Sequence, residues 1–290
     1  MYLEDGIMNK KVRANFMLLM ITVFWGASYI LTKIGLETLE TFNLISLRFI
    51  IAFLVGAAVF RKNILNTDIK TLRYSLVLSL VLFGVFISMT LGLKYTSVSS
   101  AGFLISLSVV LVPIISFIFL KERLRKKVII SIIFALVGIT LLTLNENLSI
   151  NRGDILCIVC AILFAVHIVL TGEFVKKVNS VTLSVLQLGL VGVFSSIFSL
   201  FTESFKLPNT PLSWIVVFSL SILCTALGYI VQGAAQKYIS ATHTGLILSL
   251  EPVFSALFAY IFLGEFLTLK GYIGAIILLL SVLIATLEFR

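Results

Sequence analysis

Ten apolar runs of membrane-crossing length constrain this chain more than any other feature of its sequence. A helix rises 1.5 Å per residue, so about 20 apolar residues cross the hydrocarbon core of a bilayer. The runs lack period-two alternation and therefore predict an all-α integral membrane protein, not a β-barrel. They cover residues 14–35, 43–60, 72–93, 98–120, 128–145, 153–172, 181–201, 212–236, 243–263 and 270–287.

The composition supports a bilayer as the solvent of this chain. Hydrophobic residues make up 60% of it and charged residues 12%, against roughly 45–50% and about 25% in soluble domains. The net charge of +9 could indicate a nucleic-acid partner. Basic loops facing the cytoplasm explain it better, so we expect a lipid bilayer as partner and no nucleic acid.

The loop charges predict the orientation of the chain. With the N-terminus inside, the inner segments hold sixteen Lys and Arg residues and the outer segments hold five. This asymmetry agrees with the positive-inside rule. Ten spans then return the C-terminus to the cytoplasmic side, so we predict a multi-pass protein of the cell membrane with both termini in the cytoplasm.

The chain also contains an internal repeat. Residues 95–124 resemble residues 238–267 at a shift of 143, with identical pairs such as Tyr95/Tyr238, Gly102/Gly245 and Glu122/Glu265. Spans one and six align more weakly at a shift of 139. Two five-helix units, residues 14–145 and 153–287, follow from this pattern. Because five is odd, the second unit must be inverted relative to the first, as in many secondary transporters that work by alternating access.

Several motifs in this framework point to a family. The first half carries Phe24-Trp25-Gly26-Ala27-Ser28-Tyr29, Leu47-Arg48-Phe49 and Gly92-Leu93-Lys94-Tyr95-Thr96-Ser97, and the second half carries Ala235-Gln236-Lys237-Tyr238 and Ser249-Leu250-Glu251-Pro252-Val253-Phe254. In this order and spacing, they resemble EamA-domain proteins of the ten-helix branch of the drug/metabolite transporter superfamily. The resemblance implies a central cavity, export of metabolites, amino acids or drugs, and in several members coupling to protons. It leaves the substrate open.

Glu251 is the most prominent ionisable residue within the predicted spans. An ionisable group in the membrane interior is costly and is a functional candidate by default. Pro252 follows it and frees backbone carbonyls nearby, and burial favours the neutral form of a carboxyl group. One interpretation is therefore an acid that couples protons or binds substrate. The other is a structural glutamate paired with Arg48 or with hydroxyl groups.

Arg48 and His167 are the other two ionisable residues within the spans. Arg48 could extend to the outer interface, or it could face a cavity and bind an anionic group such as a carboxylate. His167 could be a hydrogen-bonded core residue, or it could carry a proton near neutral pH. The shift of 139 places His167 opposite Ser28.

Uncharged candidates complete the predicted site. Trp25, Ser28 and Tyr29 share one helix face and could bind solute or pack against lipid and helices. Gln232 and Gln236 are four positions apart and could bind solute or bridge helices, and Gln187 is a weaker candidate. Small residues are expected to permit close helix packing; these are Gly26, Gly56, Gly102, Gly138, Gly245 and Gly274.

The function that these features favour is secondary active transport, with export of a small metabolite or amino acid, proton coupling as an option, and a monomer or homodimer as the assembly. Cys157, Cys160 and Cys224 lie in apolar runs and are interpreted as small buried hydrophobic residues. We expect no cofactor, no metal and no catalytic residue, hence no enzyme. A channel-like or non-transporting membrane protein is the alternative, and an integral membrane enzyme is a more distant one.

Overall fold

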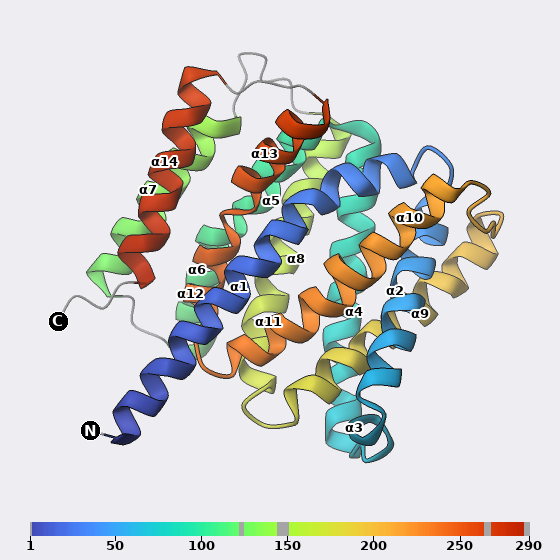
Figure 1. The fold of residues 1–290 in the computed structure, drawn as a ribbon, viewed down its shortest axis with the longest axis horizontal. Helices are drawn as coiled ribbons and strands as arrows, with labels where there is room; N and C mark the ends of the chain where they lie inside the picture. Colours follow the sequence, from blue (N-terminus) through green and yellow to red (C-terminus); the bar gives the residue numbers. More distant parts are fainter. Residues whose placement is uncertain (1, 122–124, 144–150, 264–267, 287–290) are drawn as a thin grey trace.

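The computed structural model describes residues 2–121, 125–143, 151–263 and 268–286, and within them the chain is helical throughout its regular elements (Figure 1). The repeat pair Glu122/Glu265, the basic loop at Arg123 and the predicted span ends at 145 and 287 lie outside these residues. The first half forms α1 (Tyr2–Gly35), α2 (Thr41–Val59), α3 (Arg61–Leu65), α4 (Ile69–Tyr95), α5 (Val98–Ser106), α6 (Ser108–Leu120) and α7 (Lys126–Thr143). The second half forms α8 (Arg152–Phe174), α9 (Ser180–Thr202), α10 (Pro211–Ser219), a π-helix η1 (Leu220–Leu227), α11 (Gly228–Gln236), α12 (Ala241–Leu248), α13 (Glu251–Leu263) and α14 (Leu269–Thr286).

Seven helical stretches of the described residues are long and apolar enough to cross a membrane on their own. They correspond to the first four predicted spans and to the sixth, seventh and eighth. The other three predicted spans are also helical, as α7, α12 with α13, and α14. The prediction of an all-helical protein with several membrane-crossing helices is confirmed, and the count of ten spans remains a prediction.

The predicted ninth span is not one continuous helix. It breaks between α12 and α13, so Glu251 is the first residue of α13. The sequence had indicated that Glu251 lies within a continuous helix over residues 243–263. Pro252 explains the break, since it has no N–H to donate to the preceding turn and its ring clashes with that turn. The first copy is interrupted at the equivalent point, between α5 and α6 at Leu107, so discontinuous helices occur in both halves.

The two halves of the chain pack against each other. Helix α1 ends at Gly35 and α8 at Phe174, while α2 and α9 follow the caps Glu40 and Asn179; both pairs keep the shift of 139. Equivalent helices meet each other, α2 along α9 and α7 along α14 (Figure 1). Large apolar side chains such as Phe117 and Phe201 are exposed on the outside, which a bilayer tolerates and water does not.

Polar caps define where several helices begin. Asn151 and Asp154 form a reciprocal capping box at the start of α8. Asp68 caps α4 and accepts hydrogen bonds from the hydroxyl and the backbone N–H of Thr71. These bonds stabilise the charged carboxylate and hold the pKa of Asp68 below its usual range.

Glu203 joins the two halves at one end of the bundle. This residue ends α9, and its carboxylate accepts hydrogen bonds from the backbone N–H groups of Phe42 and Asn43 at 3.0 and 2.9 Å. Those N–H groups lie in the first turn of α2, where they have no partner within the helix and where the helix dipole favours an anion. The Asn43 side chain adds a bond to the Lys206 carbonyl at 2.8 Å.

Glu203→Gln is expected to lower the melting temperature of the protein in detergent. Hydrogen bonds to a charged group contribute about 1.5–3 kcal/mol, and the amide removes the charge and one of the two acceptors. Glu37→Gln is the matched control, because Glu37 is exposed and no side-chain hydrogen bond from it is recorded among the described residues. Equal melting temperatures for the two variants would show that the Glu203 contact adds no stability.

Candidate functional site

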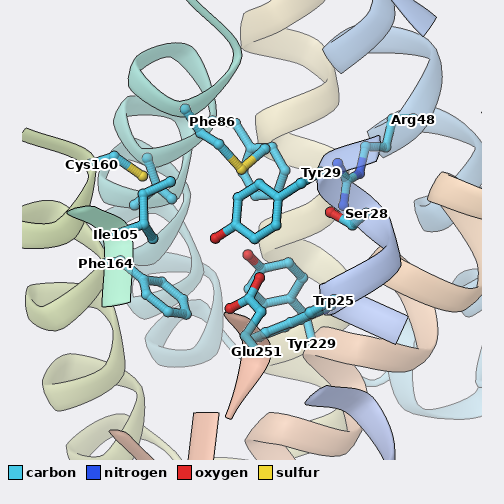
Figure 2. Close-up of a pocket in the computed structure, with 12 residues that line it drawn as sticks. Trp25, Ser28, Tyr29, Arg48, Phe86, Ile105, Cys160, Phe164, Tyr229 and Glu251 are labelled. Carbon is cyan, nitrogen blue, oxygen red and sulfur yellow. The ribbon is translucent and has the colours of Figure 1, made fainter. Parts of the chain in front are cut away.

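A small cavity lies where the two halves of the chain meet (Figure 2). Its volume is about 30 Å³, which is room for about two water molecules. Residues of α1, α2, α4, α5, α8, α11 and α13 form its wall. They are Trp25, Ser28, Tyr29, Arg48, Val85, Phe86, Met89, Ile105, Cys160, Phe164, Tyr229 and Glu251.

Glu251 enters the cavity from the first turn of α13. Its side chain is buried and shares the cavity with the Tyr29 side chain. Figure 2 shows the hydroxyl groups of Tyr29 and Tyr229 and the carboxyl group of Glu251 pointing toward one another. The break before α13 therefore aims an acid into the space between the halves. A buried carboxylate needs a partner of opposite charge or a proton, and this cavity can offer either.

Arg48 reaches the same cavity from α2. It is only 3% exposed, so the interpretation in which it extends to the outer interface is wrong. Its Nε donates to the Thr225 hydroxyl at 2.5 Å, and its guanidinium lies 4.7 Å from the centre of the Phe86 ring, a cation–π distance. Ion pairs among the described residues include Lys94–Glu40 and Lys176–Glu173, but none joins Arg48 to Glu251. Arg48 and Glu251 thus share a cavity without neutralising each other directly.

The π-helix η1 holds both Arg48 and Trp25 in place. The carbonyl of Cys224 accepts a hydrogen bond from the indole N–H of Trp25 at 2.7 Å. The Thr225 hydroxyl, which accepts the bond from Arg48, itself donates to the Leu220 carbonyl at 2.8 Å. A π-helix accommodates extra residues and redirects backbone groups, often at functional sites. The capping residue of α4 precedes Tyr95 by 27 positions, and that of α10 precedes Tyr238 by 28. We infer that η1 absorbs this additional residue of the second copy.

Thr225→Val is expected to lower the melting temperature of the protein in detergent, whereas Thr225→Ser should remain close to the unchanged protein. Valine keeps the shape of threonine but leaves the buried Arg48 Nε without its acceptor, which costs about 1–3 kcal/mol. Serine restores the acceptor. The measurement is thermal unfolding of the two variants side by side. Equal melting temperatures for the valine and serine variants would contradict a role for the Thr225 hydroxyl in holding Arg48.

The structure divides the nine residues predicted for the site into two groups. Five of them line the cavity, and the shared face of Trp25, Ser28 and Tyr29 points into it as one surface. The others, His167, Gln187, Gln232 and Gln236, lie beside the cavity in a second polar cluster between α8, α9 and α11. The second polar cluster consists of His167, Thr171, Ser184, Gln187, Gln232 and Gln236.

Several residues of the site were not predicted: the cavity residues Phe86, Phe164 and Tyr229, and Thr225, which accepts the Arg48 hydrogen bond. The repeat contained a signal for three of them. Phe86 and Tyr229 are related by the shift of 143, and Trp25 and Phe164 by the shift of 139, so each pair places an aromatic ring from both halves at the cavity. All three cysteines are free and buried, as predicted. Within the described residues, no three His, Cys, Asp or Glu side chains form a group that could hold a metal ion.

The packed helices, of which seven in the described part of the chain are long and apolar enough to cross a membrane, indicate a multi-pass membrane protein. The chain belongs to the EamA-like transporter family, whose model matches residues 12–144 and 151–287, one copy in each half. An "uncharacterized transporter" of Archaeoglobus fulgidus is 30% identical over 96% of this chain and 87% of its own. The "uncharacterized transporter YyaM" of Bacillus subtilis is 27% identical over 96% and 94%.

A crystal structure shares the fold. It superposes with a TM-score of 0.80 over 95% of this chain and 96% of its own, at 18% identity. That likeness concerns the arrangement of the helices alone.

Proposed function

We propose that this chain is a secondary active transporter that exports a small metabolite or amino acid across the cell membrane in exchange for protons. In this proposal ten helices cross the membrane, both termini are cytoplasmic, and residues 14–145 and 153–287 are inverted five-helix units. The observation that carries the proposal is the cavity between the two halves, in which a buried arginine and a buried acid face the same space.

The charges of the cavity support a solute with an anionic group. Arg48 uses its Nε on Thr225, and its terminal N–H groups are the donors that a carboxylate prefers. Aromatic rings from both halves provide apolar surface for the remainder of the solute. At about 30 Å³ the cavity is too small for an amino acid, which fits a closed conformation between inward-open and outward-open states.

Glu251 supports proton coupling because a proton and a cationic solute group would compete for its carboxylate. A buried carboxylate can be neutralised by a proton or by a cationic group of the solute. Because Glu251 is the one acid among the described residues that line the cavity, a proton and the cationic group of the solute cannot both bind it at the same time. Solute would leave on one side when a proton takes its place, and the inverted repeats would return the acid to the other side.

Counterflow in proteoliposomes tests this function. Vesicles are preloaded with single unlabelled amino acids or small metabolites, and uptake of the radiolabelled form is followed with and without a pH gradient. Protein-free vesicles are the control. We expect saturable exchange of at least one solute, stimulated by the gradient. A solute flux per protein far above the turnover rate of a carrier would instead indicate a channel. Chemical alteration of the solute would indicate an enzyme.

A further inference from the structure

The second polar cluster is buried as deeply as any apolar part of the protein. Each of its six side chains is at most 2% exposed. They come from three helices: α8 provides His167 and Thr171, α9 provides Ser184 and Gln187, and α11 provides Gln232 and Gln236. So many polar groups in a membrane-embedded interior require an explanation, because each is costly there unless fully hydrogen-bonded.

The hydrogen bonds within the cluster do not satisfy it. His167 Nε2 pairs with Gln187 Oε1 at 3.0 Å, Gln232 donates to Gln236 at 3.1 Å, and Gln236 donates to the Ile168 carbonyl at 2.8 Å. Four other buried atoms of the cluster have no partner among the described residues: His167 Nδ1, Thr171 Oγ1, Ser184 Oγ and Gln232 Oε1. Native proteins leave few such atoms unpaired, and here four occur in six neighbouring residues.

The cluster extends from the cavity to one end of the bundle. The His167 ring meets the ring of the cavity residue Tyr229 edge-on, with 5.7 Å between centroids. Along α11, Tyr229, Gln232 and Gln236 lie at positions i, i+3 and i+7, hence on one face. The next residue, Lys237, is exposed. The seven-residue step from Tyr229 to Gln236 along the helix corresponds to about 10 Å.

Helices α9 and α11 are in close contact beside the cluster. A Cβ atom placed on Gly233 would collide with the Ser184 hydroxyl, so the two helices touch there with no room for a further atom. One of the four unpaired atoms, Ser184 Oγ, therefore lies at this tight contact.

The internal repeat relates the cluster to the cavity wall. Ser28 and Arg48 correspond to His167 and Gln187 at the shift of 139, and Met89 corresponds to Gln232 at the shift of 143. All three residues of the first half line the cavity, and all three counterparts belong to the second polar cluster. Inverted repeats exchange conformations when a transporter changes state, so the second-half residues should then take the place of the first.

We propose that the second polar cluster is the closed section of the solute path, and that it becomes a water-filled passage from the cavity to the Lys176, Lys177 and Lys237 end of the bundle. This inference rests on the proposed function and its cytoplasmic assignment of that end. The groups in the passage are amides, hydroxyls and a histidine. Such a lining hydrates a polar or zwitterionic solute without holding a fixed charge of either sign, so the solute passes through while Arg48 and Glu251 form the binding site.

Thiol labelling tests the passage without knowledge of the solute. Ser184→Cys introduces a nearly isosteric thiol at the contact with Gly233. Ser195→Cys is the matched control on the same helix, since Ser195 is also buried but its hydroxyl is bonded to the Val191 carbonyl. The probe is the membrane-impermeant reagent methanethiosulfonate ethylsulfonate, applied to inside-out vesicles and to right-side-out spheroplasts. The unchanged protein, with its three buried cysteines, gives the background.

We expect Ser184→Cys to react from the cytoplasmic side at least ten times faster than Ser195→Cys. Thr171→Cys, on α8, should react likewise and provides a second test if the first variant does not fold. Labelling after denaturation shows that each thiol is present. No difference between either variant and the control, from either side, would overturn the passage, and reaction only from the outside would overturn its direction.

The counterflow measurement separates this inference from the proposed function. Solute exchange together with unreactive thiols at both positions would leave the transporter standing and remove the passage. Reactive thiols in a protein that exchanges no solute would leave the hydrated passage standing and count against transport.

Discussion

Gly26→Ala is expected to destabilise the protein strongly and to disturb the cavity. A Cβ atom at this position would lie 2.6 Å from the Cβ of Phe254 and 2.8 Å from the backbone nitrogen of Ser255. Backbone atoms cannot move aside as a flexible side chain can, so α1 and α13 must separate, at a cost of about 1–3 kcal/mol. Glu251 begins α13, and its geometry would change with the helix. Melting temperature in detergent is the measurement.

Gly102→Ala is the matched control for this prediction. Both glycines were expected from the sequence to permit close helix packing, but a Cβ at Gly102 would meet nothing within 4 Å, so the expectation is wrong for Gly102. Alanine is the better helix former by about 1 kcal/mol, and the melting temperature should stay the same or rise slightly. A similar loss of stability in both variants would mean that the contact of α1 with α13 is not what Gly26 protects.

Arg48→Gln is expected to weaken solute binding strongly during exchange. The substitution removes the charge and the forked donors that we assign to the anionic group of the solute, and a charge-assisted hydrogen bond contributes about 1.5–3 kcal/mol. At 1.4 kcal/mol per factor of ten, the concentration for half-maximal exchange should rise about tenfold or more. The measurement is counterflow over a range of solute concentrations.

Two further variants separate the effect of the Arg48 geometry from the effect of charge. Arg48→Lys keeps the charge but loses the Nε bond to Thr225 and the planar contact with Phe86, so exchange should remain clearly impaired. Lys33→Gln removes an exposed cation of α1 and should leave exchange unchanged. Full activity in Arg48→Lys would show that charge alone matters, and an equal defect in Lys33→Gln would show a general effect of net charge.

Much of the architecture could be predicted because it follows from length and periodicity. Apolar runs of about 20 residues require helices in a bilayer, and the repeat at shifts of 139 and 143 predicted which helices correspond. The common face of Trp25, Ser28 and Tyr29 needed only helical spacing.

The composition of the site could not be predicted in the same way. Helices that are apolar on all sides give no indication of which face meets the interior, so the depth of Arg48 and the separation of Gln187 from the cavity were hidden. The acceptor Thr225 lies 177 positions from Arg48, and Glu203 is 161 positions from Phe42. Contacts of that kind between the halves depend on the assembled bundle. The π-helix depends on a single additional residue, which sequence periodicity does not reveal.

The most direct test of the account is the movement of protons that accompanies the solute. Proteoliposomes contain a pH-sensitive dye, and the solute found by counterflow is added outside to the unchanged protein, to Glu251→Gln and to the control Glu37→Gln. We predict a solute-dependent change of internal pH with the unchanged protein and the control, and at least a tenfold smaller change with Glu251→Gln. Solute-driven proton movement at the full rate in Glu251→Gln would contradict the central role of Glu251.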